Sequence, residues 1–193
     1  MKQEVTGYNP VRRIYAGHGK PAGISGYFVA KFNQKFIKTG TYRGTDFTVG
    51  AVEQHKGENI GCYVTFGGKN DVVILLKIGT SFTSIENARK NLEAEIPDWN
   101  FNKTKAELEN TWNEFLGKIE LVNAPEDDKI KFNTALYHSL IHPRLYSDVN
   151  GEYPRFAGNG EIEKAEGFDY YDDFSNWDIY RAQMPLLSII APK

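Results

Sequence analysis

The sequence contains a single cysteine, Cys62, among its 193 residues. One thiol excludes an intrachain disulfide and any metal site built from several cysteines. The neighbouring residues Ile60, Tyr63 and Val64 are typical of a strand, and no nearby group would lower the pKa of the thiol. We therefore interpret Cys62 as a structural residue of a strand.

A strong net charge and a long apolar run are also missing. The net charge is −2 and the isoelectric point is near 6.1, so the chain lacks the basic field that attracts nucleic acids or anionic membranes. No segment reaches the ~20 apolar residues that span a bilayer, and residues 1–5 lack the apolar core of a signal peptide. We expect no nucleic-acid partner and no membrane span.

The overall composition is that of an ordinary globular protein, with 40% hydrophobic and 25% charged residues. Aromatic residues make up 13% of the chain. That content suits a carbohydrate-binding protein and a β-rich core equally well, so it does not decide between them.

Residues 12–79 have the pattern of strands separated by glycine-bearing turns. The predicted strands are residues 27–32, 36–39, 47–49, 62–66 and 72–78. The last is a nearly continuous apolar run, typical of a strand that is buried on both faces or central in a sandwich. Five such strands predict an incomplete sandwich layer with exposed edges.

Helical periodicity begins at Ser84. Thr83 and Glu86 have the spacing of a capping box, Ala88 and Leu92 fall on one helical stripe with Ile96, and Pro97 should end this helix. Further helices are predicted from a cap at Asn102 through about residue 119, from Pro125 to about Ile141, and from Ser175 onward with a kink or break caused by Pro185. Residues 146–169 are predicted to form a long irregular loop. The fold class is therefore α+β.

The segment 174–182, Phe-Ser-Asn-Trp-Asp-Ile-Tyr-Arg-Ala, carries side chains that suit a sugar ring. The indole of Trp177 offers an apolar face to ring C–H groups, and the carboxylate of Asp178 can accept two hydroxyl hydrogens. A structural alternative stays open. Ser175 and Asp178 also have capping-box spacing, in which case Asp178 would bond the helix backbone and Trp177 would pack in a core.

Neighbouring residues are open to the same two interpretations. Arg181 lies one helical turn after Asp178, where it would either orient that carboxylate or form a surface pair worth at most ~1 kcal/mol. Tyr171, with Tyr170 and Phe174, would either line a sugar pocket or pack beside the helix.

Together with residues 84–96 and 134–140, this motif resembles the family 92 glycoside hydrolases, the calcium-dependent exo-α-mannosidases. The resemblance runs from about Ile24 to Pro192. It implies three parts: residues 1–82 as the C-terminal part of a β-sandwich domain, 83–122 as a helical linker, and 123–193 as the start of an α/α toroid catalytic domain. It also implies that Trp177 and Asp178 contact the terminal mannose of a glycan. Asn176 and Ile179 stand where many members carry Leu and Thr, which leaves fine specificity open.

The resemblance further implies that the general acid, the general base and most calcium ligands lie beyond Lys193. Calcium would then be the cofactor of a longer parent enzyme, the missing remainder would be a partner of this chain, and the isolated chain would be inactive. Family members are commonly periplasmic, cell-surface or secreted. The alternatives are a non-catalytic carbohydrate-binding protein or degenerate remnant, and a domain junction that folds only with the remainder. The linkage preference is not determined by these residues.

Three other patterns favour structural roles over metal binding. His138 and His142 are four residues apart, but no glutamate follows His138 as a zinc-protease motif requires. Residues 148–151 favour a tight turn over a calcium loop. The remaining pattern is an acidic stretch that we expect to be a solvated loop, formed by Glu161, Glu163, Glu166, Asp169, Asp172 and Asp173.

Overall fold

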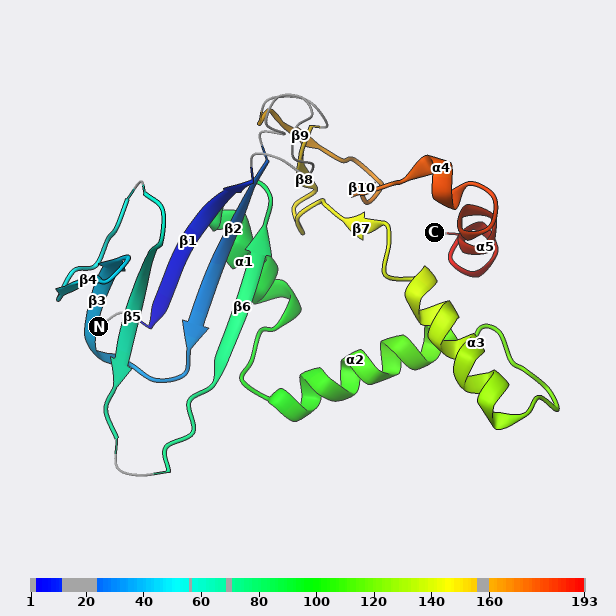
Figure 1. Cartoon of the computed structure of the whole chain (residues 1–193), viewed down its shortest axis with the longest axis horizontal. Coiled ribbons are helices and arrows are strands. Elements are labelled where there is room, and N and C mark those ends of the chain that lie inside the picture. The colour runs from blue at the N-terminus through cyan, green and yellow to red at the C-terminus, as the bar shows by residue number, and fades with distance from the viewer. Residues whose placement is uncertain (1–2, 12–23, 56, 69–70, 156–159, 193) are drawn as a thin grey trace. The chain divides into compact units, whose positions relative to one another are not determined.

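The computed structural model describes residues 3–11, 24–55, 57–68, 71–155 and 160–192. These residues belong to two compact units (Figure 1). The first unit comprises Met1–Pro10 and Ser25–Trp99, and the second comprises Val11–Ile24 and Asn100–Lys193. Residues 12–23, the first part of the predicted strand region, lie outside the described residues.

Two three-stranded sheets make up most of the first unit. One has the order β1-β2-β6, with β1 at Glu4–Val11, β2 at Ile24–Phe32 and β6 at Leu76–Ser81. The other has the order β4-β3-β5, with β3 at Phe36–Arg43, β4 at Asp46–Val49 and β5 at Ile60–Phe66. The aromatic ring of Phe32 contacts those of Phe36 and Phe66, with centroids 5.4 and 5.2 Å away, which joins the two sheets.

The strand predictions are confirmed at β2, β3, β4 and β5, but the last one is displaced. The strand expected at residues 72–78 begins at Leu76 and ends at Ser81, and β1 was not anticipated. Leu76 and Ile78 are 49% and 51% exposed, so the prediction that this strand is buried on both faces is wrong. The physical reason is that helix α1 covers the face that carries Gly79, whereas Leu76 and Ile78 alternate onto the other face.

Helix α1, Ile85–Glu95, packs on β6 as its apolar stripe requires. Ala88 and Leu92 are fully buried against Val29 of β2, and Ile96 packs at the edge of this cluster. The N-cap is Ser84, whose Oγ accepts a hydrogen bond from the backbone N–H of Asn87 at 3.0 Å. The predicted cap at Thr83 is wrong, because Thr83 Oγ1 accepts instead from the side chain of Asn87.

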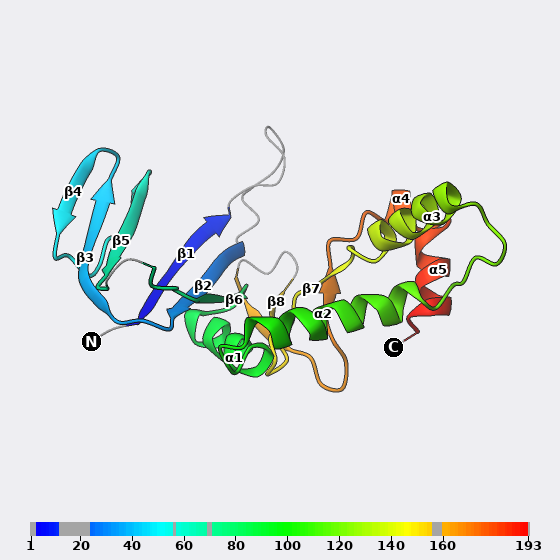
Figure 2. The ribbon, with the colours of Figure 1, turned by 90° about the horizontal axis from the view of Figure 1, so that it is seen from below.

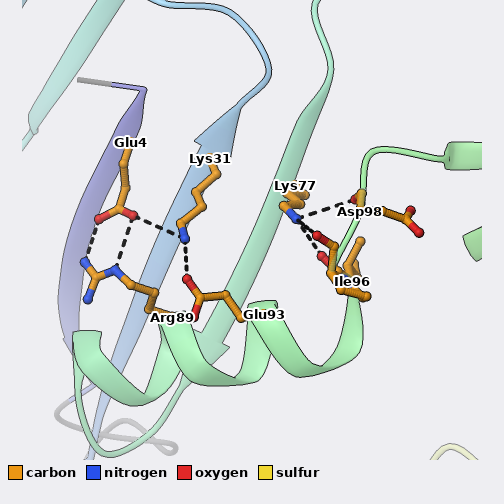
Figure 3. A network of polar contacts seen from close by, with 8 residues as sticks. Glu4, Lys31, Lys77, Arg89, Glu93, Ile96 and Asp98 are labelled. Carbon is orange, nitrogen blue, oxygen red and sulfur yellow. Dashed lines mark hydrogen bonds and ion pairs between the residues drawn. The ribbon is translucent and has the colours of Figure 1, made fainter. Parts of the chain in front are cut away.

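Ion pairs and hydrogen bonds from a lysine also hold α1 against the sheet (Figure 3). Arg89 and Glu93 of α1 pair with Glu4 of β1 and Lys31 of β2, respectively. At the helix C-terminus, the Nζ of Lys77 donates to the carbonyl oxygens of Ile96 and Pro97 at 2.6 and 3.2 Å. A cation at this end of a helix also interacts favourably with the helix dipole.

The second unit contains the remaining helices and four short strands (Figure 2). Helix α2 spans Phe101–Leu116 and α3 spans Glu126–Ser139, and the rings of Trp112 and Tyr137 pack between them at 4.6 Å. The cap of α2 is Asn100 rather than the predicted Asn102, because Asn100 Oδ1 accepts from the N–H of Lys103. Pro125 is the N-cap of α3, one residue before the helix, rather than a residue of its first turn as predicted.

The predicted loop at residues 146–169 contains short paired strands, and the predicted final helix is divided, which is one of the two outcomes expected for it. Strands β8, Glu152–Pro154, and β9, Ile162–Lys164, pair within the predicted loop, and β7, Arg144–Leu145, pairs with β10, Tyr171–Asp172. The final helix is divided into α4, Asn176–Ile179, and α5, Gln183–Ile190. The division precedes Pro185, which lies in the first turn of α5, where its missing N–H breaks no helical hydrogen bond.

No helix in the described ranges is both long enough and apolar enough to cross a bilayer. The predicted order of the α+β fold, strands first and helices after, is confirmed.

Candidate functional site

Two of the predicted sugar-binding residues, Trp177 and Asp178, lie on helix α4, which is a single turn. Trp177 is 79% exposed, and its ring lies beside that of Tyr180, with centroids 6.5 Å apart. The alternative in which Trp177 packs in a core is therefore wrong. An exposed indole with one aromatic neighbour leaves an apolar face free for a ligand.

Asp178 bonds to a side chain, not to the helix backbone. The hydroxyl of Ser175 donates a short hydrogen bond to Asp178 Oδ2, while the backbone N–H of Asp178 donates to the Ser175 carbonyl at 2.9 Å. No side chain caps the N-terminus of α4, so the capping-box alternative is not what the structure shows. An ionised carboxylate has about four lone-pair positions, so Asp178 retains acceptor capacity beyond the bond from Ser175.

Arg181 turns toward Tyr180 instead of Asp178. Its Nε donates to the Tyr180 hydroxyl at 2.7 Å, and its guanidinium carbon lies 5.1 Å from the centroid of that ring. The described part of the chain shows no contact between Arg181 and Asp178, so Arg181 neither orients that carboxylate nor pairs with it here. The reason is local: α4 ends at Ile179, and the helical spacing that would bring the two side chains together is lost in the turn that follows.

The three aromatic residues before α4 have different surroundings. Tyr171 lies on β10 opposite Leu145 and is about half exposed. Tyr170 stacks on Tyr153, with centroids 4.0 Å apart and planes 12° from parallel. Phe174 is 40% exposed. Tyr171 and Phe174 are thus accessible beside α4 in the sequence, whereas one face of the Tyr170 ring is already covered.

A charged cluster that sequence reasoning missed lies immediately before α4. The carboxylate of Asp173 accepts hydrogen bonds from the guanidinium of Arg144 and, at 2.9 Å, from the hydroxyl of Tyr146. Burial, followed by the bond to Asp173, raises the pKa of Tyr146 to about 12, which keeps this donor protonated. Asp173 lies 27 residues after Tyr146 and 29 after Arg144. No sequence pattern indicates that these residues meet across the irregular segment between them.

The expectation of a solvated loop holds for Glu161, Glu163, Glu166 and Asp169, which are exposed, but part of this acidic stretch also forms specific pairs. Arg155 forms ion pairs with Glu161 and Glu163 at 3.0 and 3.4 Å. Glu163 also accepts from the hydroxyl of Tyr153, and this bond raises the pKa of that tyrosine. Paired carboxylates hold the β8–β9 segment together rather than forming a concave ligand set.

No metal-binding cluster of three or more histidine, cysteine or acidic residues exists within the described ranges. His142 lies beyond the end of α3 at Ser139, so His138 and His142 do not share one helix face. The predicted tight turn is confirmed by the 2.7 Å hydrogen bond from Gly151 N–H to the Asp148 carbonyl and by the positive φ of Gly151, +84°.

Cys62 lies on β5, as predicted, and its side chain is exposed. Partial desolvation raises the pKa of this thiol, which disfavours the nucleophilic thiolate.

Comparison with known proteins identifies relatives along the whole chain. The model of the glycosyl hydrolase family 92 N-terminal domain matches residues 1–81, and that of the family 92 catalytic domain matches residues 87–193. A protein described as an uncharacterized secreted glycosidase of Arthroderma benhamiae is 33% identical over 96 residues, which are 47% of this chain and 12% of that protein.

Two solved structures extend this likeness to the fold. A family GH92 α-mannosidase from Bacteroides thetaiotaomicron is 30% identical with a TM-score of 0.81, over 96% of this chain and 25% of that one. The structure of that mannosidase in complex with mannoimidazole gives 29% identity and a TM-score of 0.80, over 96% of this chain and 24% of that one. The chain thus spans about a quarter of the length of these structures.

Proposed function

The chain belongs to glycosyl hydrolase family 92, and we propose that it forms part of an inverting exo-α-mannosidase in which Trp177 and Asp178 make one wall of the pocket for a terminal mannose. The observation that carries this proposal is the exposure of Trp177 beside an accessible carboxylate, within the residues matched by the catalytic-domain model. A mannosidase relative whose structure holds mannoimidazole supports the same substrate class.

The chemistry assigned to these two residues is binding. The Trp177 indole packs on the C–H face of the sugar ring, and Asp178 accepts hydrogen bonds from two of its hydroxyls. Asp178 can do so because, among the residues that the structure describes, its carboxylate accepts a hydrogen bond from Ser175 alone, whereas Asp173 is already held by Arg144 and Tyr146. Asp178 is therefore the better hydroxyl acceptor of the two.

Inverting hydrolysis requires further groups. A water oxygen bonds to C1 while the bond from C1 to the glycosidic oxygen breaks. The leaving oxygen takes a proton from a general acid, and a general base takes a proton from the water. The two carboxyl groups must lie ~6.5–9.5 Å apart to admit that water. We assign neither role, nor the calcium ion of the whole enzyme, to the described residues.

The proposed organisation keeps three parts: residues 1–82 from the β-sandwich domain, 83–122 as a helical linker and 123–193 from the α/α toroid. On this account the isolated chain binds mannose weakly and does not hydrolyse mannosides. Incubating the purified 193-residue chain with an aryl α-mannoside and calcium checks this. Calcium-dependent turnover would contradict it.

Binding is tested by titrating the chain with methyl α-mannopyranoside. A hydrogen bond to a charged group contributes roughly 1.5–3 kcal/mol, so Asp178→Ala should weaken affinity about tenfold or more. Asp127→Ala is the matched control, because Asp127 is an exposed carboxylate of the same unit in the first turn of α3. Equal affinity of wild type and Asp178→Ala would contradict the proposed role.

A second candidate is a non-catalytic carbohydrate-binding protein of the same family. The observation that favours it is the exposed Trp177 beside an accessible carboxylate, an arrangement that suits sugar binding without hydrolysis. The mass of the native polypeptide, measured by immunoblot and mass spectrometry, separates the two. A product several times 21.9 kDa supports the enzyme, and a product near that mass favours the binding protein.

A further inference from the structure

Helix α4 is too short to hold its own position. It has four residues, none of them buried, and an isolated helix of one turn is unstable in water because nucleation costs more than its few hydrogen bonds return. The positions of Trp177 and Asp178 must therefore be set by the segments on either side.

The segment before α4 is held through Asp173. Its carboxylate is bonded by Arg144 of β7 and by Tyr146, just beyond that strand, and only 22% of the side chain is exposed. Asp173 also has a left-handed backbone, with φ of +70°, a conformation that is sparsely populated for a non-glycine residue and persists only when its surroundings hold it. Two residues later, the Ser175 carbonyl accepts the first hydrogen bonds of α4.

The segment after α4 is held through Gln183. Its Nε2 donates to the carbonyl oxygens of Ser139 and His142 at 2.8 and 2.6 Å. Ser139 is the last residue of α3, and carbonyls at a helix C-terminus lack partners within the helix. One amide group thus fixes the start of α5 to the end of α3, four residues after α4 ends.

We propose that Asp173, with Arg144 and Tyr146, and Gln183 are positioning residues that hold α4 from both sides and thereby place Trp177 and Asp178 for sugar binding. The expected effect on sugar binding rests on the proposed function. The anchoring of α4 by these residues can be tested without a sugar. Preorganised groups bind more tightly because less conformational entropy is lost on binding. Loosening either anchor should therefore lower affinity while leaving the fold intact.

The test replaces tryptophan with 5-fluorotryptophan and records ¹⁹F NMR spectra of the 193-residue chain. Its three tryptophans, Trp99, Trp112 and Trp177, give three resonances, which Trp→Phe variants assign. Asp173→Asn keeps the shape and the tolerance of a left-handed backbone but removes the charge, and Gln183→Ala removes the second anchor. Arg155→Ala is the matched control, because it removes ion pairs of the β8–β9 segment, which does not contain α4.

The expected result is a shifted or broadened Trp177 resonance in Asp173→Asn and in Gln183→Ala, with the Trp99 and Trp112 resonances unchanged. Arg155→Ala should leave all three in place. Affinity for methyl α-mannopyranoside should fall about threefold or more in both anchor variants and stay at the wild-type level in the control.

Two results would contradict the proposed anchoring of α4. One is an unchanged Trp177 resonance in both Asp173→Asn and Gln183→Ala. The other is loss of the whole fold in both variants, since Asp173 and Gln183 would then belong to the structural core. If the wild type binds no mannoside while the Trp177 resonance still responds to Asp173→Asn and Gln183→Ala, the anchors stand and the proposed function fails.

Discussion

Helices α1 and α4 are held in place by opposite means. Helix α1 buries Ala88 and Leu92 completely against the sheet and adds ion pairs to β1 and β2. Helix α4 buries nothing, and hydrogen-bonded side chains hold its flanks. A helix that must keep its side chains open to a ligand cannot use them for packing, so its position has to come from its neighbours.

The charged groups of the two regions follow the same contrast. The Glu4–Arg89 and Lys31–Glu93 pairs join a helix to strands that packing already holds together (Figure 3). The Arg144–Asp173–Tyr146 cluster lies where two strands of only two residues each are paired. Loss of an ion pair should therefore matter little at α1 and more at the segment before α4.

The largest expected effect comes from the packed region. Leu92→Ala removes a fully buried side chain between α1 and the sheet, and such changes cost roughly 2–5 kcal/mol through lost burial and the cavity left behind. Denaturant unfolding followed by circular dichroism measures it. Leu108→Ala on α2, where the leucine is 58% exposed, should cost less than about 0.5 kcal/mol. Equal losses would remove the contrast between packed and exposed helices.

Gly79→Ala tests how closely α1 approaches β6. A Cβ at this position would lie 2.2 Å from the Ala88 carbonyl oxygen and 2.5 Å from Leu92 Cβ, so the helix must move. Overpacking of this kind costs typically about 1–3 kcal/mol. Gly26→Ala on β2 is the control, because its Cβ would meet nothing within 4 Å. A stability loss no greater than that of the control would contradict the close contact.

Alkaline pH should loosen the segment before α4. The pKa of Tyr146 is raised from 10.0 to about 12 in the folded chain, so the stability it contributes is present below pH 10 and is lost as pH rises through 12. The free energy of unfolding, measured from pH 9 to 12, should fall less steeply in Tyr146→Phe than in wild type. Identical slopes would show that Tyr146 is not held by burial and Asp173.

The smallest effect is expected for Glu93, which is exposed. The hydrogen bond from Lys31 lowers its pKa below the ordinary value of 4.5. Its contribution is therefore present above pH 4.5 and is lost as pH falls through the lowered pKa. Denaturant unfolding of wild type should show a loss of unfolding free energy as pH falls below 4.5, and Glu93→Gln should make that loss slightly smaller. A large loss of stability at neutral pH in this variant would contradict the view that packing, not charge, holds α1.

The same contrast explains what the sequence could predict. The stripe of Ala88, Leu92 and Ile96 is visible because burial imposes a helical period, and Pro97 marks its end. The motif at Trp177 and Asp178 was recognisable by its residues, but the exposure of the indole was not, since tryptophan is equally typical of cores. The Asp173 cluster leaves no periodic trace, because Asp173 lies far along the chain from Arg144 and Tyr146 and meets them only after β7 and β10 have paired.

The most direct test of the account is a map of backbone and indole N–H chemical shifts in the ¹⁵N-labelled chain during titration with methyl α-mannopyranoside. The account predicts that the perturbed resonances are those of residues 173–181, the Trp177 indole among them, and that methyl α-glucopyranoside, which differs in the orientation of one hydroxyl, has a weaker effect. Perturbations confined to the sheets of the first unit, or none at α4 at any concentration, would contradict the proposed site.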